Sequence, residues 1–78
     1  MEIVKDFHGM NLEEAMREFH TIIGRFVREY VYLPVKDHNT YKLITGTGKI
    51  KDSFEKELQK LEIGYIIYSN NLGEIILV

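Results

Sequence analysis

The alternation of short, strand-like runs with longer amphipathic runs constrains the fold of this chain more than any other feature. The short runs are rich in Ile, Val, Leu and Tyr, and the long runs carry apolar side chains at helical spacing. In chain order, the sequence predicts a strand at 2–7, a helix at 12–30, a strand at 41–44, a helix at about 51–61, and strands at 65–68 and 74–78.

The order of these elements predicts their arrangement in space. Right-handed crossovers make the first three strands parallel and bring both helices to one face of the sheet. The sequence Asn70-Asn71-Leu72-Gly73 is typical of a hairpin turn, so the last strand is expected to be antiparallel. We therefore expect an α/β fold, a two-layer sandwich of order β-α-β-α-β-β with a mixed four-stranded sheet.

Both helices carry local signals. Asn11 is a predicted N-cap, and Glu14, three residues later, completes a capping box. Gly24 inside the first helix costs about 1 kcal/mol relative to alanine, and we expect it to allow close packing. Phe54, Leu58 and Leu61 predict the buried stripe of the second helix.

Size and composition limit the possible functions. The 78 residues predict one small domain spanning 1–78, and the absence of cysteine leaves no disulfide framework and no thiolate metal site. The net charge of -2 lacks the strong basic excess that by itself marks nucleic-acid binding. No apolar run approaches a membrane span and the first residues do not resemble a signal peptide. We expect a cytoplasmic protein with no membrane partner, a monomer or part of a larger protein.

The first candidate site is the loop Asp6-Phe7-His8-Gly9, which follows the first predicted strand. Because Asp6 and His8 are two residues apart, both are expected to point to the same side of the strand, away from the helices. There Asp6 would orient the His8 imidazole, as carboxylates do for catalytic histidines. In the alternative interpretation, Asp6 only binds loop N–H groups and His8 is an exposed surface residue.

The second candidate site is the loop Thr45-Gly46-Thr47-Gly48, which follows the second strand and precedes a helix. Glycines let the backbone approach an anion closely, and a helix N-terminus favours negative charge. Lys42, Lys49 and Lys51 surround this loop and would add positive charge. The segment matches neither the P-loop nor the dinucleotide fingerprint. The alternative is a tight strand-to-helix turn that needs a positive φ.

The other histidines, Lys5 and the tyrosines are weaker candidates for a functional role. We expect His20 to be packed or half-exposed within the first helix, and His38 to reach the site only if its loop folds over it. Lys5 shares the helix-facing side of the first strand, so it is expected at a sheet edge with its ammonium group turned to solvent. The five tyrosines can stack on bases, but tyrosines at element ends more often cap a core. These tyrosines are Tyr30, Tyr32, Tyr41, Tyr65 and Tyr68.

Together the two loops resemble the two motifs of the Smr (small MutS-related) domain family. Asp6-Phe7-His8-Gly9, followed by the sequence from Met10 to Ala15, is similar to the "LDLHG…EA" opening of that family. The sequence from Lys42 to Gly48 is similar to its second motif, HGxG or TGxG after a strand. The following helix and the terminal hairpin also fit, so the resemblance covers essentially the whole chain.

The resemblance implies a fold like the C-terminal domain of bacterial translation initiation factor three, and an endonuclease that nicks DNA or cleaves RNA, including mRNA on ribosomes. It implies acid/base roles for Asp6 and His8. It implies that Gly46 and Gly48 shape a phosphate-binding turn. The residues that we expect to bind phosphate or nucleic acid are Gly9, Thr45, Gly46, Thr47, Gly48, Lys49 and Lys51. The chain departs from the pattern in having Lys5 where the family has leucine, Thr45 where one branch has histidine, and a short turn at 70–73.

RNA fits this set of residues slightly better than DNA. In RNA the 2′-OH is a built-in nucleophile, so cleavage needs acid/base groups and no metal, whereas DNA hydrolysis must activate water and commonly uses a divalent metal. We therefore expect no cofactor for RNA, with a divalent metal as the option for DNA. The expected partners are RNA or DNA, with the ribosome as a candidate setting. The alternatives are a non-catalytic module that binds nucleic acid or protein, and a purely structural domain.

Overall fold

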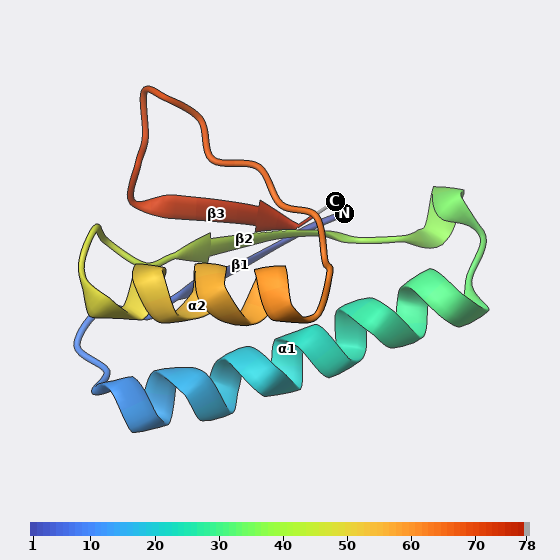
Figure 1. Cartoon of the computed structure of the whole chain (residues 1–78). Helices are drawn as coiled ribbons and strands as arrows, with labels where there is room; N and C mark the ends of the chain where they lie inside the picture. The colour runs from blue at the N-terminus through green and yellow to red at the C-terminus, as the bar shows by residue number, and fades with distance from the viewer. Residues whose placement is uncertain (78) are drawn as a thin grey trace.

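The computed structural model describes residues 1–77 and combines a three-stranded mixed sheet with two α-helices (Figure 1). Figure 1 shows both helices on the same side of the sheet, as the sequence predicts. The elements are β1 (Glu2–Asp6), α1 (Leu12–Tyr32), the 3₁₀ turn η1 (Val35–Asp37), β2 (Thr40–Ile44), α2 (Lys49–Lys60) and β3 (Glu74–Leu77).

The strand β2 lies at the centre of the sheet, between β1 and β3. β1 runs parallel to β2, with Asp6 opposite Ile44, and β3 runs antiparallel to β2, with Glu74 opposite the same Ile44. The predicted parallel first pair and the antiparallel last strand are therefore confirmed. The carboxyl ends of β1 and β2 meet at one edge of the sheet, and the turns that lead into α1 and α2 begin there.

The predicted fourth strand at 65–68 is absent, and this corrects the four-stranded expectation. Ile66 exchanges two backbone hydrogen bonds of 2.9 Å with Ile76, and this single bridge is the only pairing of the segment within residues 1–77. A turn follows, in which the Asn71 N–H donates to the Tyr68 carbonyl at 3.0 Å before the chain reaches β3. The end of the last predicted strand, Val78, lies outside the described residues.

The start of α1 follows its sequence signals. Glu14 donates its N–H to Asn11 Oδ1 at 2.8 Å, and Asn11 donates its N–H to Glu14 Oε1 at 3.4 Å, so the predicted capping box is present. A Cβ added to Gly24 would meet no atom within 4 Å, so the expectation of close packing at this glycine was wrong. Gly24 faces solvent on the outer side of the helix.

The core lies between the sheet and the two helices. Phe54 of α2 stacks on Phe19 of α1 with ring centroids 4.1 Å apart, and its edge meets Phe7 at 4.8 Å. The fully buried side chains alternate along the strands, as expected for a sheet covered on one face. They are Tyr41, Leu43, Ile75 and Leu77.

α2 differs from its prediction at both ends. It begins at Lys49 rather than Lys51, and it ends at Lys60. Glu62 adopts the left-handed backbone conformation, with φ of 59°, which reverses the chain at the helix end. The predicted stripe is correct for Phe54 and Leu58, which are buried, but Leu61 is 45% exposed because the chain leaves the helix there.

Lys5 lies on the edge strand β1 with its side chain on the helix side, as predicted. Its Nζ is 3.5 Å from Glu18 Oε1 of α1, and about a third of its side chain is exposed. Neither helix in the described part of the chain is long and apolar enough to cross a membrane.

Candidate functional site at the ends of strands β1 and β2

The fold brings the two predicted loops together. Phe7 donates its N–H to the Ile44 carbonyl at 2.9 Å, which ties the end of β1 to the end of β2. A shallow cavity of about 330 Å³ lies beside this contact, and its walls are Asp6, His8, Ile44, Thr45 and Gly46. Four of the predicted site residues therefore surround one hollow.

In the turn between β1 and α1, Asp6 binds the backbone rather than the imidazole. The His8 N–H donates to Asp6 Oδ1 at 2.8 Å, and Met10 donates its N–H to the Phe7 carbonyl at 3.2 Å. The structure gives no hydrogen bond between the Asp6 carboxylate and the His8 ring, so the predicted orienting contact is not formed here. Gly9 has a φ of 81°, a conformation that favours glycine, and this explains its place in the turn. The exposed His8 side chain is free to meet a ligand at the hollow.

In the turn between β2 and α2, the first two backbone N–H groups already donate hydrogen bonds within the protein. The Gly73 carbonyl accepts the Thr45 N–H at 2.8 Å, the Gly46 N–H at 3.1 Å and the Thr45 hydroxyl at 3.2 Å. The N–H groups of Thr45 and Gly46 therefore brace the loop against the segment before β3 and are not open to a phosphate. Gly46 has a φ of 70°, as a tight glycine turn requires.

The start of α2 leaves N–H groups open. Gly48 is the N-cap and supplies no side-chain hydrogen bond, although its carbonyl accepts the Asp52 N–H at 3.2 Å. Among residues 1–77, no protein acceptor faces the N–H groups of Thr47, Gly48 and Lys49. These groups form the positive end of the helix dipole. They are the part of the predicted anion cradle that the fold leaves accessible.

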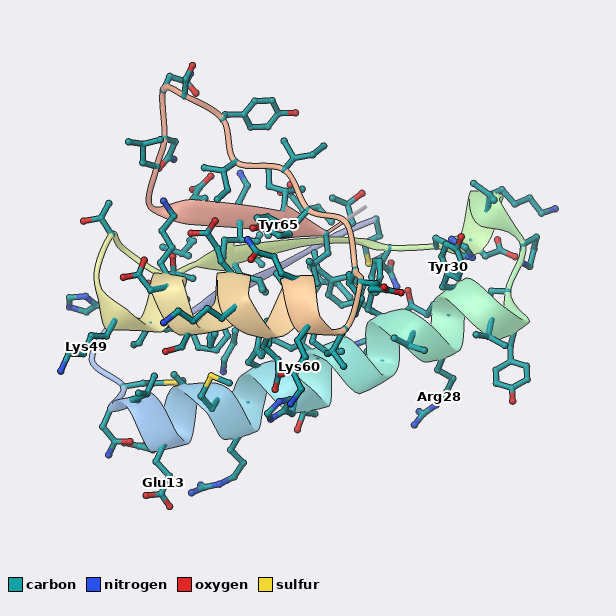
Figure 2. All side chains as sticks on the ribbon, viewed as in Figure 1. Glu13, Arg28, Tyr30, Lys49, Lys60 and Tyr65 are labelled. Carbon is teal, nitrogen blue, oxygen red and sulfur yellow. The ribbon has the colours of Figure 1, made fainter. Side chains whose placement is uncertain are left out.

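The lysines near the loop separate into two kinds. Lys49 and Lys51 lie in the first turn of α2 and form no ion pair within the described chain. Figure 2 shows Lys49 projecting away from the helix beside the turn that follows β2. Lys42 instead lies between two carboxylates, with its Nζ 3.8 Å from Glu74 and 4.0 Å from Glu2. Of these three lysines, only Lys49 and Lys51 are available to bind a phosphate.

The two other histidines lie away from the hollow. His20 Nε2 is 2.6 Å from Glu57 Oε2, so it connects α1 to α2 and is half-exposed, as predicted. His38 Nε2 is 2.8 Å from the Leu33 carbonyl, and its loop precedes β2 at the opposite end of the strand. Its loop therefore does not fold over the candidate site.

Four of the five tyrosines do not contribute to a base-stacking surface beside the hollow. Tyr41 is fully buried, and the Tyr65 hydroxyl donates to Glu55 at 3.1 Å and accepts from Gln59 at 2.9 Å. Figure 2 shows Tyr30 near the end of α1 that leads to η1, far from Lys49, and Tyr32 ends the same helix.

A polar cluster around Glu29 is not predicted by the sequence pattern. Its Oε2 accepts the Tyr41 hydroxyl at 2.6 Å and the Asn39 side-chain amide at 3.0 Å, while its Oε1 accepts the Asn39 N–H at 3.1 Å. These hydrogen bonds, that from Tyr41 above all, lower the pKa of Glu29 to about 2, and burial raises the pKa of Tyr41. The only sequence signal was a glutamate on the helix face that also carries Phe26. Because the cluster joins α1 to the start of β2, its role is structural.

Across residues 1–77, no three His, Asp, Glu or Cys side chains gather closely enough to hold a metal ion. Comparison of the chain with protein-family models, with curated proteins and with solved structures finds no match.

Proposed function

We propose that this chain is an endonuclease that cleaves single phosphodiester bonds, with RNA favoured over DNA. One observation carries the proposal. The carboxylate of Asp6 and the imidazole of His8 share a hollow with the turn that leads into the uncapped start of α2. Acid/base groups on one side and open N–H groups with two lysines on the other suit a phosphate under attack. The resemblance to the Smr family supports the same activity.

In the proposed reaction, the neutral His8 imidazole accepts the proton of the ribose 2′-OH. The 2′-oxygen attacks phosphorus, the bond from phosphorus to the 5′-oxygen breaks, the leaving oxygen takes a proton from water, and the imidazolium returns its proton to solvent. The products are a 2′,3′-cyclic phosphate and a 5′-hydroxyl. Asp6 keeps the His8 backbone in place through the 2.8 Å contact to its N–H. The N–H groups of Thr47 to Lys49, with the Lys49 and Lys51 side chains, stabilise the charge that develops on phosphate.

The test incubates the purified chain with single-stranded RNA and, separately, with supercoiled DNA, each with and without EDTA. His8→Gln and Asp6→Asn are compared with the wild type, and His20→Gln serves as a matched control away from the hollow. We expect RNA cleavage that is insensitive to EDTA, leaves a cyclic phosphate and falls at least about 100-fold in His8→Gln. Equal cleavage by wild type and His8→Gln, with both folded by circular dichroism, would reject the proposed mechanism.

A binding module is the second candidate, and one specific observation favours it. Asp6 Oδ1 already accepts the His8 N–H, so the site lacks the carboxylate–imidazole contact that commonly activates a histidine. In that case the same hollow would bind a phosphate of the nucleic-acid backbone without cleaving the phosphodiester bond. Salt-sensitive binding of RNA or DNA, with no strand scission by the wild type in any of these reactions, would favour the module over the nuclease.

A further inference from the structure

The face of the sheet that is not covered by helices has an ordered pattern of charge. The register places Asp6, Ile44 and Glu74 in one row across the three strands, and Val4, Lys42 and Ile76 in the next row. Glu2 and Thr40 form the third row. We call these eight residues the helix-free face.

Charge on the helix-free face is predominantly negative. It carries three carboxylates and one ammonium group, and the ammonium group of Lys42 lies within 4.0 Å of two of those carboxylates, Glu2 and Glu74. Val4, beside Lys42 in the register, is 52% exposed and none of the eight residues is buried, so no other described element covers this surface. The net negative charge of the helix-free face repels a polyanion. The single cation of this face, Lys42, is already paired with Glu2 and Glu74.

The opposite border of the hollow has the other sign. Lys49 and Lys51 extend the positive start of α2 and exceed the charge of Asp52 in the same turn by one; neither lysine forms an ion pair in the part of the chain that the structure describes. The hollow at Asp6 and His8 therefore lies at a boundary, with free positive charge toward α2 and negative charge toward the sheet. A single-stranded nucleic acid that reaches the hollow meets phosphate-binding groups only on the side of α2.

We infer that Glu2 and Glu74 determine the path of the nucleic-acid substrate. By pairing with Lys42 they keep the sugar-phosphate backbone off the helix-free face. A single-stranded nucleic acid therefore enters the hollow from the α2 side. The inference rests on the proposed function. In this inference Glu2 and Glu74 prevent Lys42 from binding phosphate, and Lys49 and Lys51 bind the phosphates of the substrate. Glu2 and Glu74 are specificity-determining residues that do not touch the reacting atoms.

The experiment measures binding of a fluorescein-labelled 2′-O-methyl oligouridylate, which has no free 2′-OH to react. Anisotropy titrations at several salt concentrations give the dependence of affinity on salt, and each phosphate that the protein neutralises on a single strand adds about 0.7 to the steepness of that dependence. We expect Lys49→Gln and Lys51→Gln each to reduce the slope by up to about 0.7, and Lys42→Gln to leave it unchanged.

The double variant Glu2→Gln/Glu74→Gln releases Lys42 and is expected to bind several-fold more tightly, with a slope steeper by about 0.7. Asp37→Asn/Glu62→Gln makes the same change in net charge at two exposed positions outside the helix-free face that form no ion pair within residues 1–77, and is the matched control. Three results would overturn the inference: a reduction of slope in Lys42→Gln equal to that in Lys49→Gln, a double variant no tighter than its control, or no oligonucleotide binding at all. The first two leave the proposed function intact, and the third rejects both.

Discussion

At the scale of single residues, backbone conformation explains why glycine is needed at some positions and not at others. Gly46 has a φ of 70° in the turn beside the hollow, whereas Gly24 lies in the ordinary helical region with open space around it. The same chemical change, glycine to alanine, is therefore expected to have opposite effects at the two positions.

Gly24→Ala is predicted to stabilise the chain by about 0.5–1 kcal/mol, because alanine restricts the unfolded chain and meets nothing in the helix. Gly46→Ala is predicted to destabilise it by about 1–2 kcal/mol, because an L side chain is strained at that φ. Urea unfolding monitored by circular dichroism measures both changes. A decrease in stability in Gly24→Ala would show that this helix face packs against something after all.

At the scale of elements, a charged hydrogen-bond cluster joins helix α1 to strand β2. Glu29 on α1 holds Asn39 and Tyr41 at the start of β2, in a position that is largely buried, with 11% of the Glu29 side chain exposed. The folded state therefore prefers the ionised carboxylate, and the pKa of Glu29 is lowered from 4.5 to about 2.

The lowered pKa predicts a dependence of stability on pH. Because the folded value lies below the unfolded one, the contribution of Glu29 is fully present above pH 4.5 and disappears as the pH falls toward 2. Glu29→Gln is predicted to cost about 1–3 kcal/mol at pH 7 and progressively less below pH 4.5. Unfolding curves at neutral and acid pH test this, with exposed Glu13→Gln as the control. A difference between wild type and Glu29→Gln that stays constant with pH would contradict it.

At the scale of the whole molecule, one small core stabilises both helices against one face of the sheet. Leu58 is fully buried in that core, whereas Leu61, which the helical spacing places on the same stripe, is 45% exposed. Only the three-dimensional arrangement separates these two leucines, so they offer a matched test of where the core ends.

Leu58→Ala is predicted to cost about 2–5 kcal/mol, the usual effect of a cavity in a packed core. That is a large share of the stability of a chain of this size, which is on the order of 5–10 kcal/mol. Leu61→Ala is predicted to cost well under half as much. Thermal and urea unfolding of the two variants measure the difference, and equal effects would place the edge of the core beyond the end of α2.

The sequence by itself determined what depends on neighbours along the chain. The capping box at Asn11, the alternation of strands and helices, the parallel first pair of strands, and the two turns after β1 and β2 all follow from local spacing and were predicted correctly. The tertiary structure alone decided which atoms from distant segments meet. The Gly73 carbonyl, 28 residues beyond Thr45 along the chain, occupies the N–H groups of Thr45 and Gly46, and Asp6 binds a backbone N–H instead of an imidazole. The segment at 65–68 keeps one bridge, between Ile66 and Ile76, rather than a strand. Hydrogen bonds between distant segments are set by the packing of the whole chain, which local spacing does not specify.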